Sequence, residues 1–183
     1  MTDPASLSGA LAANLRSVVT TLAGEGAVRA ALARVPESVR HDFESITGVG
    51  WIPITSMEAV FAEIALQRGQ TLAELHEQVA RIAVEQTLRT VWRMLLRLTT
   101  DHALISRAPA LFARSYNRGR VEASLSATGR GELTLHDWPN VPDWVLRGLR
   151  IGTETSLRLA GRSGVRAVSE RRPNGALLHV TWR

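Results

Sequence analysis

The sequence predicts an α+β protein, with an N-terminal helical half followed by a ββαββ antiparallel-sheet half that shares one core with it. Two patterns support this fold class. Apolar residues recur every three to four positions through the first half, and they alternate with polar residues in most of the second half. Gly-containing turns also separate two pairs of alternating segments, which is typical of β-hairpins. At 183 residues the chain is long enough for one sizeable core.

The helical half begins with an apolar stripe over residues 4–23, and Gly24 and Gly26 end this predicted helix. Short helices are predicted over 28–35 and, after Pro36, over 39–46. Residues 48–54 contain a turn and an extended stretch. The next helix repeats apolar residues at i, i+3, i+4 and i+7 before Gly69 ends it, namely Met57, Val60, Phe61 and Ile64.

The longest predicted helix runs from Thr71 to about Leu98. Thr71 and Glu74 have the spacing of a capping box, in which each side chain bonds the other residue's backbone N–H. One apolar seam covers the first part of this helix and a second begins at Val84. Two seams predict a central helix that packs on more than one side.

Strand-like alternation begins after Pro109, in segments 120–127 and 132–137, with a turn over 128–131. Asp143 is placed to cap a helix over 144–160, which Gly161 ends. Strands are predicted over 165–171 and 176–182. The Asn-Gly turn between them is a strong hairpin signal. We expect residues 1–27 to form a helical extension and residues 28–183 to form a single ligand-binding-like domain.

The composition excludes several classes of site. The chain has no cysteine, which excludes disulfides, thiolate zinc sites and iron–sulfur clusters. It also has no lysine, so neither a lysine Schiff base nor a lysine-containing phosphate loop can form. No apolar run is long enough to span a membrane, and the N-terminus lacks the features of a signal peptide. We therefore expect a soluble, cytoplasmic protein.

All 22 basic residues are arginines, and they are unevenly distributed. Residues 1–91 hold 7 arginines and 10 acids, whereas residues 92–183 hold 15 arginines and 7 acids. A basic half attracts nucleic acid, phosphorylated ligands or an acidic partner. Because a GC-rich genome also enriches arginine, and aromatic–basic repeats are missing, we do not expect nucleic-acid binding.

Catalytic patterns are weak in this sequence. There is no Gly-x-Ser-x-Gly nucleophile elbow, and no two histidines have the spacing that places two metal ligands on one helical face. His136, Asp137 and His179 are the only loose acid–base candidates. We therefore expect neither an enzyme nor a metal site.

Short motifs carry a family resemblance. They are Trp51-Ile52-Pro53-Ile54, Ser115-Tyr116-Asn117-Arg118-Gly119 and Leu178-His179-Val180-Thr181-Trp182. Over residues 28–183 the chain resembles a family of uncharacterised myxobacterial proteins of about this length. The order of its elements is also similar to the superfamily of haem-nitric-oxide-binding, 4-vinyl reductase and TRAPP-like domains. This resemblance implies a pocket between helices and sheet for haem, a small molecule or an acyl chain, and dimers formed through the helices.

The resemblance also implies a test for haem. Haem-binding members have a proximal histidine and a downstream Tyr-x-Ser-x-Arg signature that holds the propionates. His102 stands in a plausible place, and Tyr116 and Arg120 match the signature, but Arg118 occupies the serine position. Because of that departure we expect no cofactor, with haem bound through His102 as the alternative.

The sequence thus predicts a non-enzymatic sensor or regulatory domain of a bacterial cytoplasm that binds a small-molecule or lipid-like ligand and forms a homodimer. Aromatic residues on converging elements are expected to line the site, and an arginine is expected to orient a polar end of the ligand. The predicted ligand-binding residues are Trp51, Phe61, Trp92, Tyr116, Arg118, Arg120 and Trp144. The alternative is a homodimeric interaction adaptor without ligand, in which the second seam of the long helix is the exposed dimer face.

Overall fold

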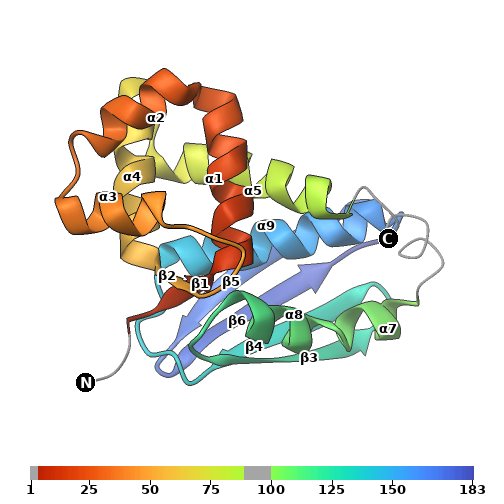
Figure 1. Cartoon of the computed structure of the whole chain (residues 1–183). Helices are drawn as coiled ribbons and strands as arrows, with labels where there is room; N and C mark the ends of the chain where they lie inside the picture. Colours follow the sequence, from red (N-terminus) through yellow and green to blue (C-terminus); the bar gives the residue numbers. More distant parts are fainter. Residues whose placement is uncertain (1–3, 89–99) are drawn as a thin grey trace. The chain divides into compact units, whose positions relative to one another are not determined.

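The computed structural model of the chain describes residues 4–88 and 100–183. The described residues form two compact units. The first lies within Met1–Ala83 and Ser115–Asn117, and the second within Val84–Arg114 and Arg118–Arg183. The α+β class and the order of its halves are confirmed, with helices in the N-terminal half and an antiparallel sheet in the C-terminal half (Figure 1).

The first unit is mostly helical. Its elements are β1 (Ser6–Ser8), α1 (Gly9–Ala23), α2 (Glu25–Leu32), α3 (Glu37–Glu44), β2 (Trp51–Pro53), α4 (Ile54–Gln67) and the first part of α5 (Leu72–Leu88). The predicted helix over 4–23 therefore starts later, because residues 6–8 form a strand that pairs antiparallel with β2. Ser8 ends this strand and caps α1, its hydroxyl accepting a hydrogen bond from the Leu11 N–H.

The helices of this unit follow the predicted patterns. Met57, Val60, Phe61 and Ile64 are fully buried along α4. The capping box of α5 is confirmed, since Glu74 accepts hydrogen bonds from the Thr71 N–H at 2.8 Å and hydroxyl at 2.9 Å, and Thr71 Oγ1 accepts one from the Glu74 N–H. The remainder of the predicted long helix, with Trp92 and most of its second seam, lies outside the described residues.

The N-terminal strand β1 contacts β2 and residues 115–117 within the first unit. Leu7 forms a β-bridge with Tyr116, in addition to pairing with β2. Asn117 accepts a hydrogen bond from the Ser6 N–H at 2.8 Å and donates one to the Pro4 carbonyl at 3.0 Å. The described part of segment 1–27 thus packs in this unit through β1 and α1.

The second unit contains the sheet. Its elements are the end of α5, α7 (Asp101–Ile105), α8 (Ala108–Ser115, of which Ser115 belongs to the first unit), β3 (Arg120–Ala127), β4 (Arg130–His136), α9 (Asp143–Leu159), β5 (Arg166–Arg172) and β6 (Gly175–Thr181). Among the described residues the strand order is β3-β4-β6-β5, antiparallel throughout. The ββαββ order is therefore confirmed, whereas α7 and α8 were not predicted.

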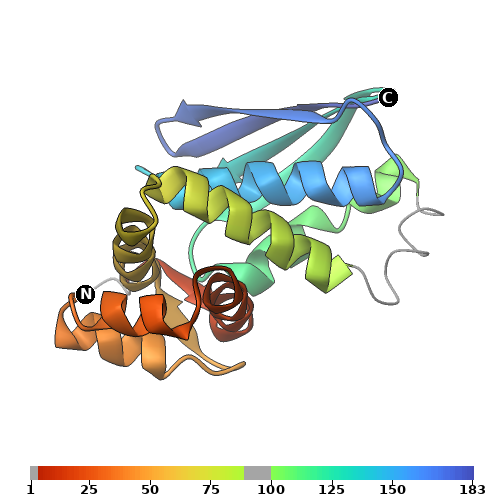
Figure 2. The ribbon, with the colours of Figure 1, turned by 90° about the horizontal axis from the view of Figure 1, so that it is seen from above.

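The two faces of this sheet differ. One face carries buried apolar side chains, such as Val121, Leu133, Leu178 and Ala167, and α9 packs along it (Figure 2). The opposite face, here named the open face, carries mostly polar and charged side chains.

No described helix is long and apolar enough to cross a membrane.

Candidate functional site

The structure places the predicted ligand-binding residues in different environments. In the first unit Phe61 and Tyr116 are buried, and Trp51 is 47% exposed. In the second unit Trp144 is buried on α9, whereas the side chains of Arg118 and Arg120 are exposed. Trp92 lies outside the described residues. The assignment of these residues to a ligand stays a prediction.

Tyr116 is the buried end of the Ser115–Gly119 motif. Its backbone bridges to Leu7, and its phenol is surrounded by protein. Burial raises the pKa of this phenol above its ordinary value, because the interior solvates the phenolate poorly. The side chain is therefore a neutral, packed group.

The predicted acid–base candidates lie on the open face of the sheet. Arg120 forms ion pairs with Glu122 and, at 2.9 Å from Nε, with Asp137, and His136 lies 3.3 Å from Glu122. The hydrogen bond to Glu122 is the main cause that raises the pKa of Arg120, and the same bond lowers the pKa of Glu122. His179 pairs with Glu132 at 3.3 Å and with Glu170 at 3.8 Å. The carboxylates of these contacts are exposed, and the contacts lie within β3 or between neighbouring strands, a common surface arrangement.

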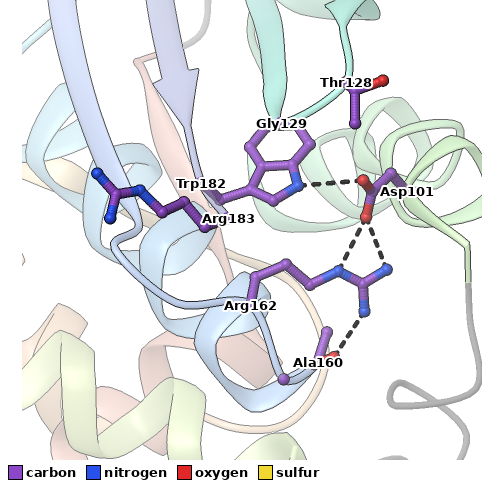
Figure 3. A pocket seen from close by; sticks show the side chains of 8 residues that line it. Asp101, Thr128, Gly129, Ala160, Arg162, Trp182 and Arg183 are labelled. Carbon is purple, nitrogen blue, oxygen red and sulfur yellow. Dashed lines mark hydrogen bonds and ion pairs between the residues drawn. The ribbon is translucent and has the colours of Figure 1, made fainter.

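A pocket of about 710 Å³ in the second unit was not predicted (Figure 3). Its lining comes from the start of α7, the β3–β4 turn, the end of α9 and the end of the chain: Asp101, Thr128, Gly129, Ala160, Gly161, Arg162, Trp182 and Arg183. Asp101 accepts hydrogen bonds from Arg162 Nε at 2.8 Å and from Trp182 Nε1 at 3.1 Å. Arg162 also donates to the Ala160 carbonyl at 2.6 Å.

This network fastens α7 to the rest of the second unit. The side chains of Asp101 and Arg162 are only 28% and 17% exposed, so their pairing replaces lost hydration. Ile105 at the other end of α7 lies close to Gly131, where a Cβ would come within 2.9 Å of its Cδ1. The Thr100–Asp101 pair was readable as a helix start, since Thr100 Oγ1 accepts a hydrogen bond from the Ala103 N–H. The bonds from Asp101 to Arg162 and Trp182, which lie 61 and 81 residues away, could not be predicted from the local sequence.

Two of the residues that the family resemblance assigned to haem, His102 and Arg120, do not fit that role in this structure. His102 is exposed on α7 and does not line the pocket beside it. A haem ligand needs an imidazole directed into an enclosed site. Arg118 is exposed, and Arg120 is engaged by carboxylates on the open face. Of the five histidines only His76, on α5, is buried. Within the described ranges no group of three or more acidic or histidine side chains could hold a metal ion.

Comparison with known proteins shows the fold. No family model matches the sequence, and no curated protein matches it. Solved structures do match over nearly the whole chain. An Fe(II) unliganded H-NOX mutant from K. algicida is 10% identical with a TM-score of 0.71, and the match covers 96% of both chains. A point mutant of T. tengcongensis H-NOX is 13% identical with a TM-score of 0.71, covering 96% of this chain and 97% of that one. An oxygen-binding H-NOX domain related to soluble guanylate cyclases has a TM-score of 0.68 at 14% identity, covering 96% of this chain and 95% of that one.

These neighbours correct one expectation and support another. The similarity to haem-nitric-oxide-binding domains is confirmed at the level of the fold. The expectation of a domain without a cofactor is contradicted, because proteins that share this fold are described as an Fe(II) H-NOX protein and an oxygen-binding H-NOX domain, and another is described by its haem redox potential. The arginine at the serine position of the signature, Arg118, therefore did not justify the expectation that the domain lacks a cofactor.

Proposed function

We propose that this chain is a non-enzymatic sensor or regulatory domain of a bacterial cytoplasm, built on the H-NOX fold, that binds a small-molecule or lipid-like ligand and signals as a homodimer. The observation that carries the proposal is the match over 96% of the chain to H-NOX domains, one of them described as oxygen-binding. The charged groups of the open face support a non-catalytic role, because Arg120, Glu122 and Asp137 are exposed and form ion pairs with one another.

The test is the search for a bound molecule in the purified full-length protein. Native mass spectrometry should show a stoichiometric adduct, either as purified or after addition of hemin or oleic acid, and an absorption scan of the same sample identifies haem by its Soret band. A protein that stays free of adduct with both probes would contradict the proposal. A clean dimer mass without adduct would favour the interaction adaptor instead.

The hemin arm needs its own control, because an exposed imidazole can coordinate free hemin without a binding site. His102→Ala removes such coordination on α7 and should leave a specific Soret band unchanged, since His102 is exposed. His76→Ala removes the one buried imidazole. If His102→Ala abolishes hemin binding and His76→Ala does not, the ligand site is the one that the resemblance implied and our interpretation of His102 is wrong.

The adaptor alternative depends on an exposed apolar helix face. Along α4 the large apolar side chains are buried, with Leu66 the exposed exception at 69%. In the described part of the second seam of α5, Val84 and Leu88 are half-buried. Analytical ultracentrifugation over a wide concentration range tests the homodimer directly. If the protein is a monomer at all concentrations, the homodimer is contradicted both in the proposed sensor and in the alternative interaction adaptor.

A further inference from the structure

A second depression of the second unit lies between the first turns of α9 and the edge strand β5. It measures about 400 Å³ and is lined by Asp143, Leu146, Arg147, Arg150, Ser169 and Arg171. We name it the arginine groove. Half of its lining residues are arginines, and they come from two elements that are adjacent only in the folded unit.

The charges that line the arginine groove do not balance. Arg171 forms an ion pair with Asp143 and donates to the Val141 carbonyl at 2.6 Å, so this guanidinium and the only lining carboxylate neutralise each other. Among the lining residues, the guanidinium of Arg147 is the one that has no partner in the described part of the chain. Arg147 and Arg150 are three residues apart on α9 and project from the same side of the helix.

Arg147 is the least satisfied of these groups. It is half-buried, and its side chain has no hydrogen-bond or ion-pair partner among the described residues. A guanidinium that loses hydration without gaining a partner is destabilising unless an anion supplies the missing acceptors. This is the feature that distinguishes the groove from a solvated arginine surface.

Edge strand β5 adds neutral donors to the groove. The Ala167 N–H points away from β6 and donates to Glu154 on α9 at 3.0 Å. Because backbone direction alternates along an antiparallel strand, the Ser169 N–H points the same way, and Ser169 also lines the groove. A hydroxyl and guanidinium groups in one concave site suit the oxygen atoms of a tetrahedral anion.

We propose that the arginine groove binds the phosphate group of a small phosphorylated molecule. Guanidinium groups bind phosphate through paired hydrogen bonds, and the unpartnered charge of Arg147 attracts an anion. The size of the depression suits a compact ligand rather than a nucleic-acid duplex, which needs an extended basic surface. The site is separate from the ligand of the proposed sensor function and does not depend on it.

The test is a titration of the full-length protein with pyrophosphate at low ionic strength, measured by isothermal calorimetry. We expect saturable binding of one pyrophosphate, and we expect Arg147→Gln to weaken it about tenfold or more, the loss expected for one charge-assisted contact. Arg166→Gln is the matched control. It removes the same charge from β5, but on the open face of the sheet, and should change the affinity by less than about twofold.

Each other outcome overturns the proposal. No binding of pyrophosphate shows that the groove does not take phosphate. Equal losses in Arg147→Gln and Arg166→Gln show diffuse attraction to a basic surface. Binding of an octaglutamate peptide that Arg147→Gln weakens, with no binding of pyrophosphate, identifies the groove as a docking site for an acidic protein segment. Backbone amide shifts of residues 146–150 and 169–171 on adding pyrophosphate would confirm the location.

Discussion

Tyr116 is the only tyrosine of the chain, so its ionisation can be followed without overlap from other phenols. Burial raises the pKa of its hydroxyl above the ordinary value of about 10. The stability that this shift confers is complete below the ordinary pKa and is lost as the pH rises toward the raised one. We expect no tyrosinate absorbance from the folded protein at pH values slightly above the ordinary pKa, and a normal titration in denaturant. Reversible ionisation near the ordinary value with the circular dichroism unchanged would show that Tyr116 is accessible.

Gly175 is a residue whose identity the backbone dictates. Its φ is +151°, and a Cβ at this position would lie 1.9 Å from the Leu135 carbonyl oxygen on β4. Gly175→Ala should lower the free energy of unfolding by more than about 2 kcal/mol, because neither backbone can move without disrupting the pairing of β4 with β6. Gly152→Ala is the control, since Gly152 lies inside α9 with open space around it and should gain up to about 1 kcal/mol in helix propensity. Urea unfolding measures both, and similar effects would contradict the close approach.

At the scale of elements, the position of α7 is stabilised by the hydrogen bonds among Asp101, Arg162 and Trp182 more than by the intrinsic stability of so short a helix. It has five residues, none of them buried, so its helical propensity cannot hold it in place. Arg162→Met should lower the free energy of unfolding by about 1 to 3 kcal/mol and should speed amide exchange in residues 101–105. Arg81→Met, which removes an exposed ion pair with Glu77 on α5, should cost less than about 0.5 kcal/mol. Unchanged exchange in α7 would mean that other contacts hold it.

The elements that sequence patterns predicted are those whose apolar residues repeat over several turns or strand positions, such as α4, α9 and the β5–β6 hairpin. The elements that were missed have physical reasons. Leu7 fits the apolar stripe of α1, so nothing local shows that residues 6–8 pair with a strand at 51–53. Strand-like alternation was predicted to begin after Pro109, whereas this proline lies in the first turn of the helix α8, where proline is tolerated.

Sites were harder to predict than elements, for the same reason. The arginine groove depends on which face of β5 carries Arg171, and this is set by the register of the hairpin with β6. The pocket beside α7 joins Asp101 to residues 61 and 81 positions away. Neither set of contacts produces a pattern in the neighbouring sequence from which it could be predicted. The aromatic residues of the predicted site were chosen because their elements were expected to converge, and two of them, Phe61 and Trp144, are buried in different units.

At the scale of the whole molecule, the likeness to H-NOX domains at 10 to 15% identity shows how little of the sequence the fold requires. The patterns that specify it are the helical repeat, the alternation of the strands and the glycine turns, and these survive extensive substitution. Ligand chemistry depends on single side chains, and the histidine that the resemblance assigned to haem, His102, is exposed in this chain. Fold and ligand must therefore be established separately.

Acid stability is a property of the whole charge distribution. With 22 arginines, 17 acids and five histidines, the net charge of +5 at neutral pH approaches +27 when every carboxylate is protonated. Hydrogen bonds from Thr71 lower the pKa of Glu74, and the bond from Arg120 lowers the pKa of Glu122. For both groups the stabilising contribution is complete above the ordinary glutamate pKa and is lost as the pH falls through the lowered one.

The urea midpoint should therefore fall as the pH decreases below about 4.5, and added salt should restore part of the loss because it screens repulsion among the arginines. Glu74→Gln should make this acid-dependent decrease shallower, since it removes one carboxylate whose proton affinity differs between the folded and unfolded chain. Glu44→Gln, an exposed residue near the end of α3, serves as the charge-matched control. If both variants follow the unmodified protein, repulsion across the arginine-rich chain, and not the capping carboxylate, governs its acid unfolding.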